Sequence, residues 1–167
     1  MPIKNPKELF LRVLSHVRQG TERSAAIYKE LGDAAQNPEI QEALAARAFV
    51  SQQDLEKLDE AFKMIGEKPV ELSGRLHDVF VEDFRRELAE IQSPEAKRLF
   101  VLAKANHLSH MRTAEYATLV AAADVSGHHG VGVLLESCLA DHLAFAERTR
   151  HLIHRVVEAK IAAKAAG

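Results

Sequence analysis

Polar side chains interrupt the middle of the apolar stripes in this sequence, and their types could support chemistry. Apolar and small residues recur every three or four positions over four long segments, as along one face of an amphipathic helix. Midway along these stripes lie polar or small residues: Gly20, Thr21 and Ser24; Arg47, Ser51 and Asp54; Arg112 and Glu115; and His142. Because all lie near mid-helix, we expect them to meet at one level of a helical bundle.

Such a layer can be explained in two ways. Buried polar groups cost free energy unless they are paired, so a layer of them needs a reason. One interpretation is a metal or cofactor site inside the bundle, with His, Glu and Asp as ligands. The other is a satisfied hydrogen-bond layer, which is the more common outcome. Both predict that Thr21, Ser51, Arg112 and His142 point inward and lie close together.

Pairs of residues at helical spacing are the candidate chelators. His107 and His110 are three apart and Cys138 and His142 are four apart, so each pair shares a helix face. Neutral imidazole is a common metal ligand. Nine histidines placed at random would also yield such pairs, and a lone cysteine such as Cys138 is most often a small buried hydrophobe.

A third histidine pair is a weaker candidate. His151 and His154 also share a face, but they lie beside arginines that would repel a cation: Arg148, Arg150 and Arg155. Other chemistries lack their signatures, since the sequence has no Gly-rich phosphate loop, no nucleophile elbow and no HExxH motif.

The composition bounds the class of protein. A length of 167 residues fits one domain, residues 1–167, with a substantial core. A net charge of −2 gives no electrostatic footprint for nucleic acid or an anionic membrane. A single cysteine cannot form an internal disulfide, which suits a cytoplasmic location. No run of eighteen apolar residues or signal core occurs, so we expect no membrane partner.

The elements that must position the polar layer are long helices. Asn-Pro and Ser-Pro pairs mark helix starts, and glycines mark ends. We predict helices over residues 5–32, 38–65, 94–124 and 131–163, with a shorter helix between the second and third. Gly32 is the expected end of the first helix. Two helical hairpins joined by a long crossover make an all-α, ferritin-like four-helix bundle with an additional short crossover helix.

The crossover segment carries several apolar residues, which we expect to be buried against another surface. They are Leu76, Val79, Phe80, Phe84 and Leu88. Large exposed apolar patches are uncommon on monomers, so we expect this segment either to pack on its own bundle or to join a two-fold homodimer.

The chain resembles the YciE/YciF type of ferritin-like protein, a bacterial family associated with stress responses that lacks a settled biochemical role. The resemblance runs over roughly residues 8–155. It rests on the first hairpin, residues 34–40, on residues 55–69 after it, and on positions in the last two long helices: His110, Ala114, Tyr116, Leu119, Leu134, Leu135, Leu139 and Ala140. Patterns of this sort identify a fold better than a function.

The resemblance implies a dinuclear metal site held by carboxylates, sometimes with histidine, from all four long helices. This sequence departs from that pattern. Thr21 aligns with the first-helix glutamate of the family, and Glu22 lies one residue later, about 100° round the helix. A one-residue slip in the alignment would restore Glu22 as a ligand. The acidic run of the second helix becomes residues 48–53, and the third helix reads Ser-His-Met-Arg over residues 109–112.

The fourth helix departs as well, since Asp141-His142 and Ala146 replace a glutamate pair and an aspartate. The metal ligands that remain available are His107, His110, Asp141 and His142. A di-iron centre needs several carboxylates to balance two cations, so the resemblance implies a degenerate site here.

Arg112 at the same level also works against a dinuclear centre, because guanidinium stays charged. It could instead supply the positive charge that a metal supplies, held by Glu115 or Asp141. We therefore expect no cofactor, with iron or manganese as the alternative.

Three functions follow from these observations. The first is a ferritin-like, stress-associated structural or binding protein that self-associates or binds a partner. The second is an iron- or manganese-dependent oxidase or ferroxidase-like enzyme with a His-rich site. The third is a small-molecule binder whose pocket is the polar centre. The sequence leaves open whether the protein is an enzyme.

Overall fold

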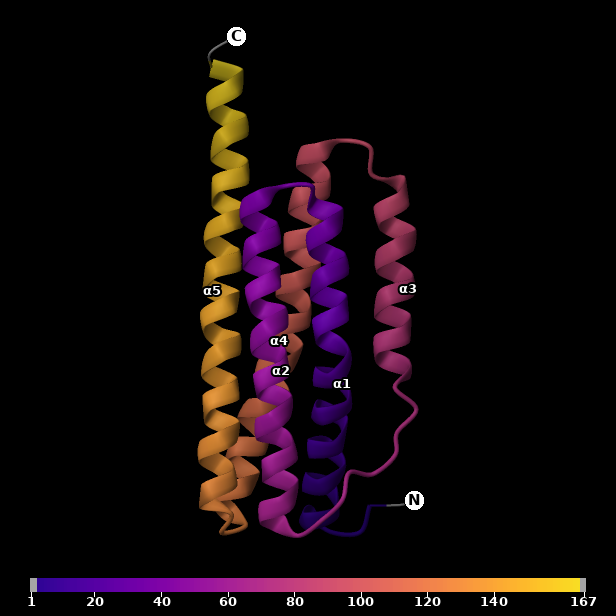
Figure 1. The fold of residues 1–167 in the computed structure, drawn as a ribbon, viewed down its shortest axis with the longest axis vertical. Coiled ribbons are helices and arrows are strands. Elements are labelled where there is room, and N and C mark those ends of the chain that lie inside the picture. Colours follow the sequence, from indigo (N-terminus) through magenta and orange to yellow (C-terminus); the bar gives the residue numbers. More distant parts are fainter. Residues whose placement is uncertain (1–2, 166–167) are drawn as a thin grey trace.

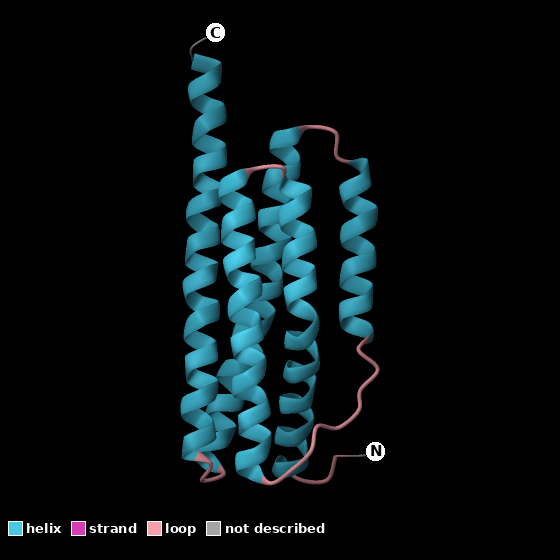
Figure 2. Cartoon of the chain, in the orientation of Figure 1, coloured by secondary structure: helices cyan, strands magenta, loops and turns pink. Residues whose placement is uncertain are grey.

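Five helices account for most of the chain in a computed structural model, which describes residues 3–165 (Figures 1 and 2). They are α1 (Pro6–Ala35), α2 (Pro38–Ile65), α3 (Arg75–Glu90), α4 (Pro94–Val125) and α5 (His129–Ala165). No strand occurs over residues 3–165, so the all-α prediction is confirmed. The four long helices lie within about three residues of the predicted bounds.

Side-chain caps explain where three of the helices begin. Asn5 accepts a hydrogen bond from the backbone N–H of Glu8, and Asn37 accepts one from Ile40. Ser93 caps α4 in the same way. Each cap is followed by proline, which has no N–H to leave unsatisfied in the first turn.

The prediction that Gly32 ends the first helix is wrong. Gly32 lies inside α1, where a Cβ would meet the Leu44 side chain at an ordinary 3.5 Å. The left-handed position that ends α1 belongs to Gln36, with φ of 48°. Packing of α1 against α2 therefore carries the helix one turn past the glycine.

The four long helices form a bundle with up-down-down-up topology. The pairs α1–α2 and α4–α5 are antiparallel hairpins, and the pairs α1–α4 and α2–α5 also pack side by side. The crossover that joins the hairpins contains α3, which lies outside the bundle against α1 and α4 (Figure 1). This is the predicted ferritin-like arrangement. The last turns of α5 extend past the end of the bundle (Figure 1).

The core consists of two apolar clusters, one toward each end of the bundle. One is built mainly from the C-terminal half of α1 and the N-terminal halves of α2 and α4, and includes Tyr28, Leu44, Leu102 and Phe145. The other is built from the opposite halves and includes Leu14, Leu58, Leu119 and Leu135. The polar residues between these positions separate the two clusters. No helix in the described chain combines the length and hydropathy that a bilayer span requires.

The crossover helix packs on its own bundle. Phe84 is buried and stacks on Phe100 of α4 with ring centroids 6.0 Å apart, and Phe80 meets His107 edge-on at 6.0 Å. Leu76 and Val79 stay exposed. Of the two alternatives for this segment, the structure shows the packing on its own bundle.

Truncating the apolar anchor of α3 tests this packing. Phe84→Ala is expected to lower the free energy of unfolding by about 3–5 kcal/mol, because it removes a fully buried ring. Leu76→Ala, on the exposed side of the same helix, is the matched control and should cost much less. Urea denaturation followed by circular dichroism measures both. Equal effects of the two substitutions would contradict the packing of α3.

Candidate functional site: a buried arginine layer

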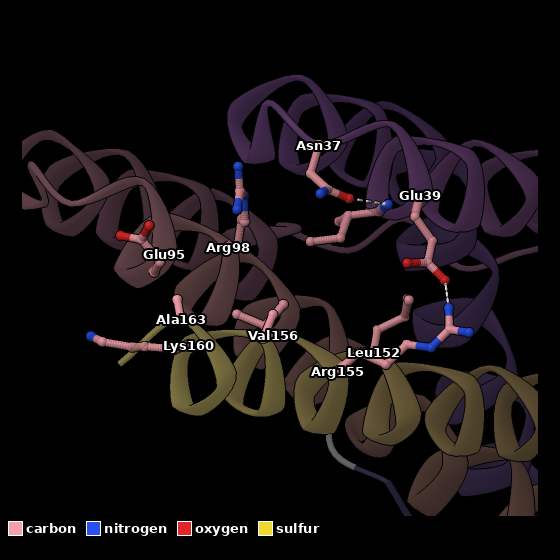
Figure 3. A pocket seen from close by; sticks show the side chains of 11 residues that line it. Asn37, Glu39, Glu95, Arg98, Leu152, Arg155, Val156, Lys160 and Ala163 are labelled. Atoms are coloured by element: carbon pink, nitrogen blue, oxygen red, sulfur yellow. Dashed lines mark hydrogen bonds and ion pairs between the residues drawn. The ribbon is translucent and has the colours of Figure 1, made fainter. Parts of the chain in front are cut away.

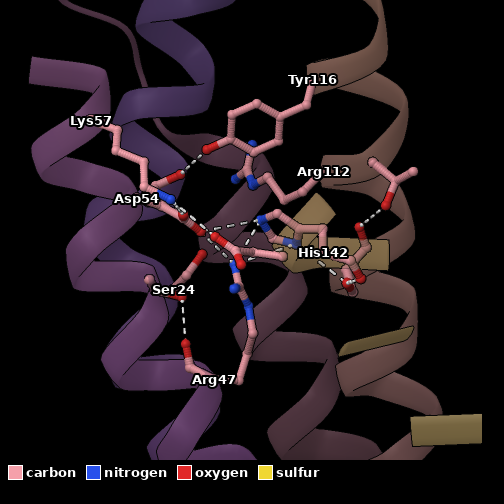
Figure 4. Close-up of polar contacts among 12 residues, drawn as sticks. Ser24, Arg47, Asp54, Lys57, Arg112, Tyr116 and His142 are labelled. Atoms are coloured by element: carbon pink, nitrogen blue, oxygen red, sulfur yellow. Dashed lines mark hydrogen bonds and ion pairs between the residues drawn. The ribbon is translucent and has the colours of Figure 1, made fainter. Parts of the chain in front are cut away.

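A polar layer lies midway along the bundle, between the two apolar clusters (Figure 4). Each long helix contributes to it. Every member is at most 3% exposed: Thr21, Ser24, Arg47, Ser51, Asp54, Ser109, Arg112 and His142. The sequence prediction that Thr21, Ser51, Arg112 and His142 point inward is confirmed. Three hydroxyls of the layer donate to backbone carbonyls, since Ser24, Ser51 and Ser109 bond the carbonyls of Gly20, Arg47 and His142.

Arg47, Asp54 and His142 form a hydrogen-bonded chain at the centre of the layer (Figure 4). The Nη2 atom of Arg47 donates to Asp54 Oδ2 at 2.9 Å and lies 2.7 Å from His142 Nε2. Arginine can only donate, so Nε2 must accept and the neutral imidazole carries its proton on Nδ1. That nitrogen lies 3.3 Å from Ser109 Oγ. The chain therefore requires a neutral histidine.

The surroundings of His142 keep it neutral. Burial first, and then the nearby charges of Arg47 and Arg112, lower the pKa of the imidazole to about 2. Burial also raises the pKa of the Asp54 carboxyl, while Arg47 and then Lys57 oppose that rise. The result is a buried ion pair beside an uncharged imidazole.

The guanidinium of Arg47 also faces aromatic rings. Its Cζ lies 5.8 Å from the ring centroid of Tyr28 and 6.0 Å from that of Phe145, within the range of a cation–π contact. Its Nε and Nη1 atoms find no hydrogen-bond partner among the described residues. The two rings therefore provide part of the stabilisation that hydrogen bonds supply elsewhere.

Arg112 is the second buried guanidinium. Its Nη1 donates to Glu115 Oε2 at 2.5 Å, which confirms one of the two partners predicted for it. Its Nη2 hydrogen-bonds Nε2 of His77, which reaches in from α3. The guanidinium lies against Gly20 of α1, where an added Cβ would overlap it. Glycine at position 20 is therefore required by the close approach of Arg112.

Asp141, the other predicted partner of Arg112, lies at the edge of the bundle instead. Its Oδ2 accepts from Lys57 Nζ at 3.0 Å, and the same ammonium lies 3.4 Å from Asp54 Oδ1. Lys57 thus links the surface to the core carboxylate.

Two further reactive groups, in the apolar cluster beside the layer, are held inert. Cys138 is fully buried and burial raises the pKa of its thiol, so no thiolate nucleophile is present. Burial also raises the pKa of Tyr116 well above its ordinary value. The Tyr116 hydroxyl lies 3.4 Å from Thr21 Oγ1, and its ring centroid is 5.4 Å from that of His142.

The predicted metal ligands are not brought together. His107 and His110 are exposed on α4, Asp141 is half-buried beside Lys57, and His142 alone is in the core. Over residues 3–165, no three His, Cys, Asp or Glu side chains are grouped so that they could hold a metal ion. Glu22, the residue that an alignment slip would bring in, is exposed and pairs with Arg18.

The residues of the layer do not fit a dinuclear metal site. Asp54 is the one fully buried carboxylate in it, and its oxygens are already bound by Arg47 and Lys57. Arg112 adds a second permanent cation at the same level. Two divalent ions would need about four negative ligands in so dry a place.

A groove at one end of the bundle is a separate feature (Figure 3). It lies between the starts of α2 and α4 and the last turns of α5, and none of its lining residues belongs to the polar layer. Arg155 pairs with Glu39 across it, and Glu95 bonds Ser93.

Sequence reasoning found the layer but missed two of its links. Arg47 and Asp54 are seven residues apart on one helix, so their pairing could have been inferred from spacing alone. The approach of His77 from the crossover helix could not, because it depends on where α3 docks.

Fold and polar layer together define a ferritin-like helical bundle whose centre is ionic and hydrogen-bonded. A family model matches residues 5–162, and the chain belongs to that family, DUF892, a domain of unknown function. The resemblance noted in the sequence is thereby confirmed. No curated protein sequence gives a significant match.

Solved structures share the fold. The Escherichia coli stress protein YciF superposes with a TM-score of 0.88 at 18% identity, over 93% of this chain and 99% of that one. YcfI from Rhodopseudomonas palustris gives 0.84 at 22% identity, over 89% and 94%. A protein from Xanthomonas campestris gives 0.76 at 16% identity, over 96% and 99%. Identities this low establish the fold alone.

Removing the buried carboxylate tests the energetics of the layer. Asp54→Asn keeps the shape but leaves Arg47 as an unpaired buried cation, so the free energy of unfolding is expected to fall by about 3–5 kcal/mol. Glu60→Gln breaks the solvent-exposed Lys63–Glu60 pair on the same helix and is the matched control, which should leave stability nearly unchanged. Urea denaturation at neutral pH measures both. A small effect at Asp54 would mean that Arg47 does not depend on it.

Proposed function

We propose that this protein is a stress-associated structural bundle that acts by self-association, with an ionic layer in place of a dinuclear metal centre. The single observation that carries the proposal is the pair of fully buried guanidiniums, Arg47 and Arg112, in the layer where the ferritin-like resemblance places metal ligands. Guanidinium cannot lose its proton in a protein, so its permanent positive charge repels a divalent cation at this site.

The relatives support the same role. The Escherichia coli structure is described as a stress protein, and YcfI has been put forward as a structural protein. Neither description names a substrate. A structural role also agrees with the inert thiol and the neutral histidine of the layer, since neither is poised for nucleophilic or acid–base chemistry.

The face of α1 and α2 supports self-association. A hollow between these helices is lined partly by small residues, Ala25, Ala26, Gly32, Ala45 and Ala48. Phe49 also lines it, with 61% of its surface exposed. A protruding Phe49 next to a hollow makes this face self-complementary. Two copies related by a two-fold axis can therefore each bury Phe49 in the hollow of the other.

The size and charge of this face fit a homodimer. The 28 residues of α2 extend about 42 Å, and two helices side by side offer about 800 Å² per partner, the area of a standard interface. The rim carries Lys29 and Asp33 one turn apart. A two-fold axis lets the lysine of each copy meet the aspartate of the other. The proposed dimer therefore uses the α1–α2 face instead of the crossover.

Metal content tests the ionic layer. Protein expressed with added iron and manganese should retain far less than one ion per chain by elemental analysis, and it should not speed the oxidation of ferrous iron. Two ions per chain would overturn the proposal in favour of the oxidase. One ion lost in both His110→Ala and His142→Ala, but kept in the exposed control His151→Ala, would overturn it in favour of a rebuilt His-rich site.

Light scattering and analytical ultracentrifugation test the dimer. The protein is expected to dimerise, and Phe49→Ser should weaken dimerisation at least tenfold, since each interface loses two buried rings. Val133→Ser removes another exposed apolar side chain, 67% exposed on α5, and should leave the dissociation constant unchanged. A monomer at high concentration, or equal effects of both substitutions, would contradict the use of this face.

A further inference from the structure

The crossover helix α3 is held to the bundle at few points. It contacts α1 and α4 only, and just two of its side chains are buried, His77 and Phe84. Phe80, Val81 and Leu88 are partly buried against the core, and the remaining attachments include exposed ion pairs such as Arg85–Glu30, which contribute little stability in water. Helix α3 is therefore a strap with one fully buried apolar anchor, Phe84, and one buried polar anchor, His77.

The polar anchor reaches into the core layer. Arg112 extends from α4 across α1 at Gly20, and its Nη2 hydrogen-bonds His77 Nε2. The His77 ring also lies against Gly20, where an added Cβ would come within 2.5 Å of the ring carbon Cε1. The absence of a side chain at Gly20 thus leaves the space in which Arg112 of the core layer contacts His77 of α3.

This contact exists only while the imidazole is neutral. Arginine has no acceptor, so His77 Nε2 must accept the hydrogen bond from Arg112. Protonation would turn that nitrogen into a donor and place two cations in direct contact. Because the contact is buried, solvent cannot screen the repulsion.

Of the neighbouring charges, Asp78 raises the pKa of His77, but by less than Arg112, His16 and Arg23 each lower it. On α1, His16 lies 6.3 Å away, ring to ring, and Arg23 bonds Asp78 of α3 at 2.7 Å. On α4, Glu115 is engaged by Arg112. Both nearby carboxylates are therefore paired with arginines already.

We propose that α3 is an acid-releasable strap, in which protonation of His77 breaks its bond to Arg112 and frees the crossover helix from α1 and α4. Release uncovers an apolar face that is closed at neutral pH, including Phe84 and the ring of Phe100 beneath it. The bundle thereby gains an interaction surface that is present only in acid.

The pH range follows from the two states of His77. In the docked strap, burial first and then Arg112, His16 and Arg23 lower its pKa to about 4 from the ordinary value of 6.5. Above pH 6.5 both states are neutral and docking does not depend on pH. Between 6.5 and 4 the released state alone binds a proton, so the opening equilibrium rises tenfold per unit and about 300-fold in total.

Hydrogen exchange read by mass spectrometry tests the strap in the intact protein. Protection factors, corrected for intrinsic exchange, are compared at pH 7, 6 and 5 for peptides of α3 and of the four long helices. We expect α3 to lose protection as the pH falls while the long helices keep theirs. Loss of protection in all five helices together would overturn the proposal, because it would report global unfolding.

Variants assign the effect to His77. His77→Gln keeps an oxygen that can accept from Arg112 but cannot titrate, so protection of α3 should become independent of pH. His16→Gln removes the neighbouring imidazole that has no bond to Arg112, and should leave the acid release in place. Acid release that persists in His77→Gln would overturn the proposal.

A glycine pair tests the contact without any titration. Gly20→Ala should expose α3 to exchange at pH 7, because the new methyl group displaces Arg112 and His77. Gly32→Ala makes the same change in the same helix, where the nearest atom is the Leu44 Cβ at 3.5 Å, and should leave α3 protected. Unchanged protection of α3 in Gly20→Ala would show that the strap does not depend on this contact.

Discussion

Two guanidiniums buried in a helical core must each find a carboxylate, and much of this structure meets that requirement. An unpaired charge in such a dry place costs several kcal/mol, far more than a typical hydrogen bond contributes. Arg47 forms an ion pair with Asp54 of its own helix, and Arg112 forms one with Glu115 of its own helix. Because both pairs are local to one helix, neither depends on how two helices are placed relative to each other. Tertiary packing then supplies the remaining partners, His142 and His77.

The same requirement connects distant parts of the chain. Both histidines must stay neutral to accept from arginine, so each is kept buried and beside a positive charge. Because Gly20 has no side chain, Arg112 can extend across α1 and reach His77 of the crossover helix. The ionic layer is thus the point where the two hairpins and the crossover meet, even though most of the buried area lies in the apolar clusters on either side.

The helices, their hairpins and the crossover could be predicted because local signals specify them. Asn37-Pro38 and Ser93-Pro94 mark helix starts through their own backbone chemistry, and apolar periodicity marks the buried faces. Gly32 misled the prediction because packing against α2 outweighs its tendency to end a helix. The polar layer was also readable, since residues seven apart share a face. The role of His77 was not, because no local pattern says which face α3 presents to the bundle.

The division of the core into two apolar clusters has a consequence for the axial register of the helices. A helix that slid along its neighbours by one turn, about 5.4 Å, would still bury aliphatic side chains against aliphatic side chains. The same slip would pull Arg47 away from His142 and push a charged group into hydrocarbon. Apolar contacts are tolerant of such translation and ionic ones are not. The layer therefore fixes the axial register of the four helices, which apolar packing alone would specify only weakly.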